Sequence, residues 1–215
     1  MNGDLPSQLA ARLQSPLPGW TAQAHYQPEL SFGRHLGPAH PGARLAAVLI
    51  LLYPREDQFN PLGDQWHIPL IVRSAHMPDH AGQVSLPGGV IEPGETSRQA
   101  ALREYAEELG ATVDGIRILG QLSELYLFAS NFQITPWVGA IGAPPHWNPN
   151  RDEVDTLLEI PLAHLMDPAN TQHIERKQRG LGFSAPCFCW QSQRIWGATS
   201  MVLAELLASL ADCTL

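Results

Sequence analysis

The stretch LPGGVIEPGETSRQAALREYAEELG, residues 86–110, decides how this chain folds. Its second half predicts a helix beginning just after Thr96, because threonine is a good N-cap and Gln99 stands where it completes a capping box. Gly110 is a natural end for this helix, since glycine readily takes the left-handed conformation found beyond helix C-termini. Two adjacent glycines, Gly88 and Gly89, lie in the loop before the helix and allow close backbone approach.

The predicted helix has an apolar side and an acidic side. At about 100° per residue, one side gathers four apolar residues, namely Leu102, Tyr105, Ala106 and Leu109. Glu104, Glu107 and Glu108 gather on the opposite side, facing away from the core, where like charges weaken a helix. Arg103 precedes Glu107 by four residues and is expected to bridge to it. Three acids on one helix face could simply be exposed to solvent. A bound cation would explain both these acids and the two glycines that precede the helix.

The whole stretch follows a known spacing. Gly89, Glu95 and then residues 103–111, REYAEELGA, give G-x5-E-x7-R-E-U-x-E-E-x-G-U, where U is a bulky apolar residue. The chain therefore resembles the Nudix hydrolases, in which this spacing is called the Nudix box, although Tyr105 and Ala111 depart from the usual U residues. The resemblance implies an α/β fold, an α/β/α sandwich with a mixed β-sheet. It also implies hydrolysis of a nucleoside diphosphate linked to another group.

The resemblance further implies roles for the acidic residues. Glu104 and Glu108 are the first candidates for metal ligands and Glu107 is the next, with Mg²⁺ or Mn²⁺ as the metal, because such cations prefer carboxylate oxygens, water and phosphates. Arg103 would orient the carboxylates, and Glu95 would support the loop or a further metal. The general base stays open between Glu107, Glu108 and a carboxylate outside the box. Without metal, like-charge repulsion is expected to raise the pKa of at least one carboxylate.

The segment before the box bears on the substrate. PLIVRSAHMPDHAGQVSLPGG, residues 69–89, resembles the coenzyme A diphosphatase signature L-L-T-x-R-S-x-x-L-R-x-H-x-G-x-x-x-F-P-G-G. The matching positions are Arg73, Ser74, His80, Gly82 and the Pro-Gly-Gly of 87–89. The departures include Ile71, Met77, Pro78 and Leu86. Pro78 replaces an arginine that could meet an anionic substrate. The resemblance to this branch covers roughly residues 44–210.

Three functions follow in order of preference. The first is a diphosphatase that cleaves coenzyme A or acyl-coenzyme A into 3′,5′-ADP and (acyl-)4′-phosphopantetheine. The second is a Nudix hydrolase acting on ADP-ribose, a dinucleoside polyphosphate or a nucleoside triphosphate. The third is a nucleotide-binding module that has lost turnover, for which a broken box would be expected; the acidic positions of this box are intact.

Substrate contacts are expected outside the acidic helix. Arg73 is the first candidate to bind a substrate phosphate, in particular the 3′-phosphate of coenzyme A, and is otherwise a surface arginine at a strand end. His80 either touches substrate or caps its loop, and a carbonyl of Gly88 or Gly89 would complete a metal shell. The basic run ERKQR, residues 175–179, would meet the 3′-phosphate if it folds over the site, and is otherwise a solvated loop. Three tryptophans would stack on adenine or pack in the core, namely Trp137, Trp147 and Trp196.

Sequence patterns elsewhere predict a mixed α/β domain over residues 44–215, preceded by an N-terminal arm, residues 1–43, with a short helix within 4–14 and irregular structure over 15–43. Strands are expected at 45–53, 66–74, 132–141 and 154–160, with a polar loop at 54–65. Pro136 suggests that its strand lies at an edge or carries a bulge. A helical turn at 161–167, a hairpin from 183–191 and 194–198, and an amphipathic helix over 199–212 complete the chain.

Composition narrows the partners. The formal net charge of -8 disfavours binding to nucleic acid or to an anionic membrane. The three cysteines match neither a disulfide framework nor a usual zinc site. The first residues lack a signal peptide pattern, and the longest apolar run is too short to cross a bilayer. We expect a cytoplasmic protein with a small-molecule nucleotide substrate, and allow for a homodimer.

Overall fold

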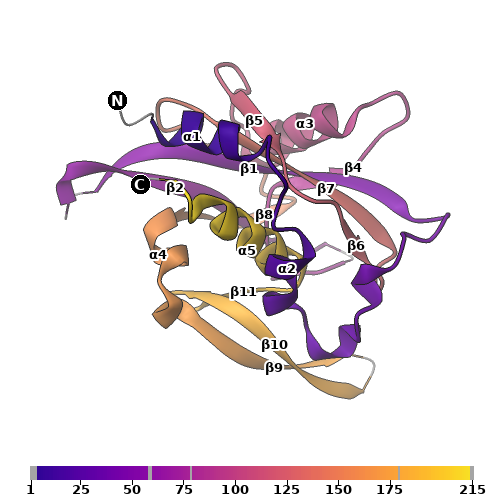
Figure 1. Cartoon of the computed structure of the whole chain (residues 1–215). Helices are drawn as coiled ribbons and strands as arrows, with labels where there is room; N and C mark the ends of the chain where they lie inside the picture. The colour runs from indigo at the N-terminus through magenta and orange to yellow at the C-terminus, as the bar shows by residue number, and fades with distance from the viewer. Residues whose placement is uncertain (1–3, 58–59, 78, 179, 214–215) are drawn as a thin grey trace.

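The computed structural model describes residues 4–57, 60–77, 79–178 and 180–213. The chain forms a mixed β-sheet with helices on both faces (Figure 1), as predicted. The strands of this sheet are β1 (Arg44–Asp57), β2 (Asn60–Arg73), β3 (Val84–Ser85), β4 (Gly88–Val90), β5 (Arg117–Gln121), β6 (Leu125–Leu127), β7 (Phe132–Ala140) and β8 (Val154–Pro161). Their order is β3-β2-β1-β7-β5, with β4 also paired to β1, β6 to β7 and β8 to β2.

Strand β1 lies at the centre of the sheet. It runs parallel to β7 and antiparallel to β2 and β4. Residues 49–53 are completely buried, which explains the continuous apolar run that predicted this strand. Alternate side chains face opposite ways: Leu49 and Leu51 pack in one core cluster, and Ile50 and Leu52 pack in another.

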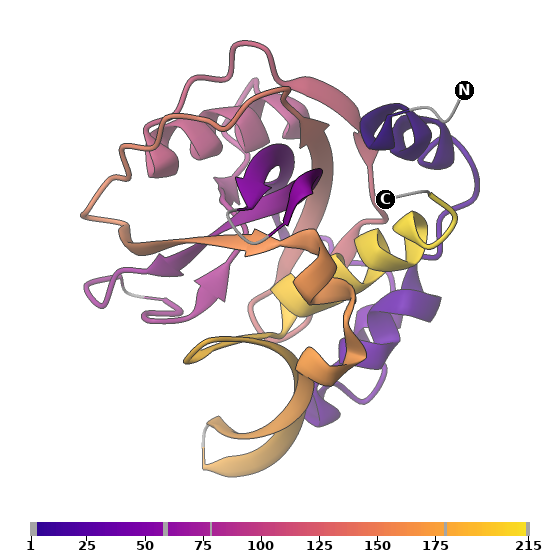
Figure 2. The same ribbon diagram turned by 90° about the vertical axis from the view of Figure 1, so that its left-hand side faces the viewer.

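Helices cover each of these clusters. Helix α3 (Ser97–Leu109) lies on one face of the sheet, while α1 (Leu5–Arg12), α2 (Trp20–Gln23) and α5 (Ala198–Leu210) lie on the other (Figure 2). Helix α4 (Leu162–Met166) follows β8 and confirms the helical turn predicted at 161–167. No helix among the described residues is both long and apolar enough to cross a membrane.

A second, three-stranded sheet contains β9 (Thr171–Gln178), β10 (Leu181–Trp190) and β11 (Gln193–Trp196). Strands β10 and β11 form the predicted hairpin. Both ribbon views place β9 and β10 at the end of the molecule opposite to α3 (Figures 1 and 2). A short 3₁₀ helix, η4 (Pro168–Asn170), leads into this sheet.

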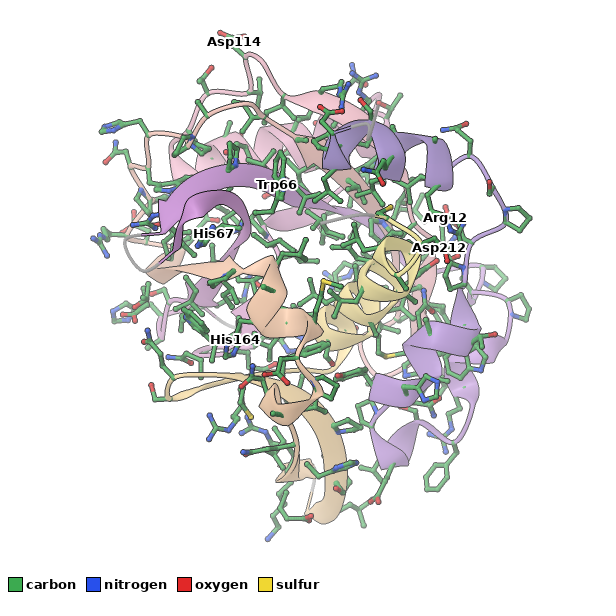
Figure 3. The ribbon with its side chains drawn as sticks, turned by 60° about the vertical axis from the view of Figure 1, so that its left-hand side comes forward. Arg12, Trp66, His67, Asp114, His164 and Asp212 are labelled. Atoms are coloured by element: carbon green, nitrogen blue, oxygen red, sulfur yellow. The ribbon has the colours of Figure 1, made fainter. Side chains whose placement is uncertain are left out.

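Residues 4–43 pack against the rest of the chain. The short helix expected within 4–14 is confirmed as α1, whose Leu5 and Leu9 join the core. Figure 3 shows Arg12 beside Asp212, and the Arg12 Nε donates to an Asp212 carboxylate oxygen at 3.2 Å. The segment expected to be irregular contains α2 and three 3₁₀ helices, namely η1 (Ala24–Tyr26), η2 (Glu29–Ser31) and η3 (Arg34–Leu36).

Three local predictions are wrong. The polar loop expected at 54–65 is largely strand, because β1 continues to Asp57 and β2 resumes at Asn60. Pro136 was expected at a sheet edge or a bulge, but it lies in the internal strand β7. This strand pairs with β1 on one side and with β5 and β6 on the other, and Pro136 falls between the residues paired with β5 and those paired with β6. Helix α5 is buried almost all round rather than amphipathic, since it is enclosed by the sheet and the N-terminal segment.

Candidate active site

Helix α3 begins and ends where the sequence predicts. The Thr96 hydroxyl accepts the Gln99 backbone N–H at 3.3 Å, and the Gln99 side chain accepts the Thr96 N–H at 2.9 Å, which completes the capping box. Gly110 adopts φ 59° at the C-terminal end. A Cβ there would overlap the Asn148 carbonyl, so glycine serves both the turn and the packing of the next loop.

The orientation of Glu108 corrects the sequence analysis. Ala101, Tyr105 and Leu109 are buried against the sheet, but Glu108 is also only 2% exposed and does not face away from the core. Its carboxylate turns toward β4, where Oε2 accepts the Gly88 backbone N–H at 2.9 Å. Glu107 is the outward acid, with a side chain 55% exposed. The acids of α3 therefore differ in exposure, with Glu107 at the surface and Glu108 in the interior.

Arg103 holds the acidic face together. Its guanidinium donates to Glu95 at 2.8 Å, to Glu104 at 2.9 Å and to Glu107 at 3.0 Å, so the predicted bridge to Glu107 is confirmed. A further bond, at 3.1 Å, reaches the Val90 carbonyl on β4. The Arg103 contact also keeps the pKa of the Glu95 carboxyl below its usual range. One arginine thus offsets much of the repulsion expected among these carboxylates.

The two glycines before the helix allow the close approach that was predicted. A Cβ at Gly88 would overlap the Ala47 carbonyl and Val48 of the neighbouring strand β1. A Cβ at Gly89 would overlap the Glu104 carboxylate. The backbone of β4 therefore lies directly against the acidic face of α3, and only residues without side chains fit there.

Glu108 carries the largest resolved pKa shift among these acids. Burial raises its pKa to about 8, because a charged carboxylate is poorly solvated there, while the Gly88 N–H and Arg73 act in the opposite direction. Repulsion from Glu104 and Glu153 adds to the increase. A raised pKa was expected, but burial is its main cause rather than like-charge repulsion. Burial likewise raises the pKa of Glu104.

Arg73 reaches this site from the end of β2. Its Nη1 lies 3.8 Å from the Glu108 Oε1, and its side chain is 19% exposed. The Arg73 Nε is buried without a hydrogen-bond partner. A buried guanidinium nitrogen with an unused donor is suited to an anionic ligand.

Glu153 is an acid that the sequence analysis did not single out. Its charge contributes to the raised pKa of both Glu104 and Glu108, and its loop is bonded to the end of α3. The loop before β8 carries it there, because Asn150 N–H donates to the Glu108 carbonyl at 2.9 Å and Ser74 N–H donates to the Glu153 carbonyl at 2.8 Å. The sequence analysis allowed for a general base outside the Nudix box, but it did not identify Glu153, because only the fold brings Glu153 close to α3.

The remaining expected contacts lie elsewhere or are structural. His80 is exposed, and its Nδ1 is 3.2 Å from the Gln83 Oε1 within the same loop; its neighbour Pro78 lies outside the described residues. The basic run, of which Arg179 is also outside the described residues, belongs to β9 rather than to a loop and lies away from α3. Arg176 there lies 5.0 Å from the Trp196 ring centroid.

Two tryptophans near α3 contact protein groups. Trp147 packs edge-on against Tyr53 and Tyr105, with ring centroids 5.6 and 6.2 Å away. Trp137 Nε1 donates to the Ser97 hydroxyl at 3.1 Å, at the start of α3. Both rings therefore help to seat the helix on the sheet.

The donor set suits a hard divalent cation. Among the described ranges, no group of three or more His, Cys, Asp or Glu side chains is arranged to hold a metal ion, and Arg103 pairs with Glu104 and Glu107 instead. Even so, the buried Glu108 carboxylate, the Glu104 carboxylate and the side-chain-free backbone at Gly89 converge on one place. Oxygen ligands of this kind fit hard divalent cations.

Comparison with known proteins decides the family. A family model described as the NUDIX domain matches residues 43–176, which include α3 and its acids. The chain belongs to the Nudix family. It is a Nudix hydrolase, an enzyme that acts on phosphoric anhydride bonds of nucleoside diphosphate-linked substrates, and this family generally uses divalent metal ions.

Relatives and solved structures agree with this assignment. The chain is 37% identical to the "Uncharacterized Nudix hydrolase NudL" of Pectobacterium atrosepticum over 65% of this chain and 73% of the relative. It is 31% identical to the protein of the same name from Yersinia enterocolitica over 91% of this chain and 87% of the relative. The fold resembles the Nudix hydrolase RenU of M. smegmatis, with a TM-score of 0.55, 19% identity and coverage of 88% of this chain and 96% of RenU.

Proposed function

We propose that this Nudix hydrolase cleaves coenzyme A or an acyl-coenzyme A, with Mg²⁺ or Mn²⁺, into 3′,5′-ADP and (acyl-)4′-phosphopantetheine. The observation that carries the proposal is the segment 69–89, which resembles the coenzyme A diphosphatase signature and ends at the acidic site. Its Arg73 presents a guanidinium with an unused donor beside Glu108. We also propose that residues 44–215 form the catalytic domain and residues 1–43 an appended arm.

Each part of the site has a distinct task in this reaction. Glu104 and Glu108, with Glu107 at the solvent edge, would hold the metal, and a carbonyl of Gly88 or Gly89 would add a ligand. When bound, the metal supplies charge neutralisation and lowers the pKa of water. Arg103 keeps the carboxylates in place through its ion pairs. Water adds to one phosphorus, and the bridging P–O bond breaks.

Arg73 would bind the diphosphate during this step, because its unpartnered Nε is buried beside the carboxylates. Arg73 would offset part of the negative charge of the diphosphate, which otherwise repels an attacking water. Glu153 would accept the proton of that water, since backbone hydrogen bonds from its loop to Glu108 and from Ser74 to Glu153 hold it beside the helix that presents the other acids.

The substrate is tested by incubating the protein with Mn²⁺ and a panel of diphosphates. The panel contains coenzyme A, an acyl-coenzyme A, ADP-ribose, a dinucleoside polyphosphate and a nucleoside triphosphate, and products are identified by mass. We expect coenzyme A or its acyl derivative to be cleaved with the highest kcat/KM. Cleavage of ADP-ribose while coenzyme A survives would favour another Nudix substrate, and binding without any cleavage would favour a nucleotide-binding module.

Replacement of Arg73 tests its contact with the substrate. We expect Arg73→Ala to raise KM about 10- to 100-fold, which is the loss of a charge-assisted hydrogen bond. Because Arg73 stands beside Glu108, the increase should be similar for coenzyme A and dephospho-coenzyme A. A selective increase for coenzyme A would place Arg73 on the 3′-phosphate instead. Arg73→Lys serves as the matched control, since it keeps the charge but loses the planar fork.

Replacement of Glu153 tests the general base. We expect Glu153→Gln to lower kcat at saturating Mn²⁺ by at least about 100-fold, as the loss of general base catalysis does. The metal concentration for half-maximal rate should change little. The exposed neighbour variant Asp152→Asn is the control. A large increase in the metal requirement with an unchanged kcat would make Glu153 a metal ligand rather than the base.

A further inference from the structure

An open cavity lies between the N-terminal segment and the β6–β7 turn. Its volume is about 590 Å³, and it is lined on one side by residues 32–34 and 37–41 and on the other by Tyr126 and Phe128. The first group of residues precedes the range that matches the family model. The cavity therefore combines an element outside the family core with a turn inside it.

Two exposed aromatic side chains dominate this cavity. Phe32 is 72% exposed and Phe128 is 50% exposed, although large apolar rings usually gain from burial. The Arg34 guanidinium lies 5.6 Å from the Phe32 ring centroid and 4.7 Å from that of Phe128. Phe32 also adopts φ 46°, a left-handed conformation that is costly for a bulky residue and is often found at ligand sites.

Hydrogen bonds fix both walls of the cavity. His35 Nδ1 lies 2.6 Å from the Tyr126 carbonyl, and its Nε2 lies 2.9 Å from the Ser31 hydroxyl. Asn131 Nδ2 donates to the Gly42 carbonyl at 3.0 Å, and the Tyr126 hydroxyl donates to Asn131 Oδ1 at 3.0 Å. The aromatic rings are thus presented by a framework that is already formed, which lowers the entropic cost of binding.

The sheet connects this cavity with the acidic site. Val90, whose carbonyl is bonded to Arg103, pairs with Ala46 of β1; Ala46 pairs with Ile134 of β7, and Ile134 pairs with Leu125 of β6. Three interstrand steps separate Val90 from Leu125, or about 14 Å. An extended nucleoside diphosphate, from the far edge of its base to its second phosphate, has a length comparable to this span.

We infer that this cavity binds the purine base of the substrate's nucleoside. Exposed phenyl rings, a tyrosine and a guanidinium form the combination on which a base stacks, because each offers a flat, polarisable or cationic face. Every nucleoside diphosphate-linked substrate carries a base, so the inference goes beyond the coenzyme A proposal and does not require it.

The test compares ligands with and without a base. The dissociation constants of ADP and of inorganic pyrophosphate are measured by calorimetry in Mg²⁺ for the wild type and for Phe128→Ala. We expect the variant to bind ADP at least about fivefold more weakly, as expected for a lost base–aromatic stack, and to bind pyrophosphate as the wild type does. Phe128→Tyr, which keeps a ring, should bind ADP within about twofold of the wild type.

A matched control comes from an exposed apolar residue outside the cavity. Leu181→Ala, at a position 62% exposed on β10, should leave both constants unchanged. Equal ADP binding by wild type and Phe128→Ala, equal weakening for ADP and pyrophosphate, or a wild type that prefers pyrophosphate would each overturn the inference. If the protein does not cleave coenzyme A, the proposed substrate is wrong, but the comparison of ADP with pyrophosphate still tests the cavity. If the KM for coenzyme A is the same in Phe128→Ala and the wild type, the role of the cavity is wrong and the proposed substrate is unaffected.

Discussion

Glu108→Gln is expected to lower kcat about 1,000-fold while leaving the protein folded. Glu108 is the most deeply buried acid of α3 and lies between the Gly88 N–H and Arg73. A neutral glutamine amide oxygen would bind a divalent metal more weakly than the carboxylate oxygen that we propose as its ligand. Loss of roughly 4 kcal/mol of metal-assisted stabilisation of the transition state corresponds to this decrease. The measurement is kcat at saturating Mg²⁺ and at saturating Mn²⁺.

The fold of this variant should survive for a reason that the sequence alone did not give. The glutamine Oε1 can still accept the Gly88 N–H, and substitution removes a charge that burial and two neighbouring acids disfavour. The thermal midpoint without metal should therefore be unchanged or higher. Glu107→Gln is the matched control, and because Glu107 is 55% exposed its effect on kcat should be smaller. Near-wild-type turnover of Glu108→Gln at saturating metal would refute its assignment as a ligand.

The sequence predicted which residues form the acidic site more accurately than it predicted how deeply each of them is buried. The spacing of Glu104, Glu107 and Glu108 identified one helix, its caps and the arginine that pairs with its acids. Helical periodicity assigned Glu108 to the solvent side, because it treats a helix as packed against one plane. In the structure β4 rises beside α3, and Gly88 and Gly89 bring its backbone against the acids. A tertiary contact therefore made an exposed position an interior one.

The contribution of distant segments was the least predictable part. Glu153 reaches the site only because its loop is bonded to the end of α3 and to Ser74. The aromatic cavity depends on contacts between residues 32–41 and the β6–β7 turn, which are about ninety positions apart. Local patterns cannot report such contacts, since they describe neighbours along the chain. They did identify most strands, because burial on one or both faces leaves a periodic signal.

A buried carboxylate explains how the N-terminal segment is held. Glu205 of α5 is fully buried, and its carboxylate accepts three hydrogen bonds from outside its own helix. The Gly19 N–H and the Ser123 N–H donate to Oε1, each at 3.1 Å, and Gln23 Nε2 donates to Oε2 at 2.7 Å. One side chain therefore ties α5 to the segment before and within α2 and to the turn between β5 and β6.

Glu205→Ala is expected to destabilise the protein by about 3 kcal/mol, because it leaves buried donors without partners. For a chain of this size the thermal midpoint should fall by roughly 6–12 °C. Glu205→Gln, which keeps one acceptor, should fall between this variant and the wild type, and the exposed Glu175→Ala should change stability by less than about 0.5 kcal/mol. Since Gly19 and Gln23 lead into the segment that lines the aromatic cavity, Glu205→Ala should also weaken ADP binding below the melting transition. Equal midpoints for Glu205→Ala and Glu175→Ala would show that this carboxylate does not hold the segment in place.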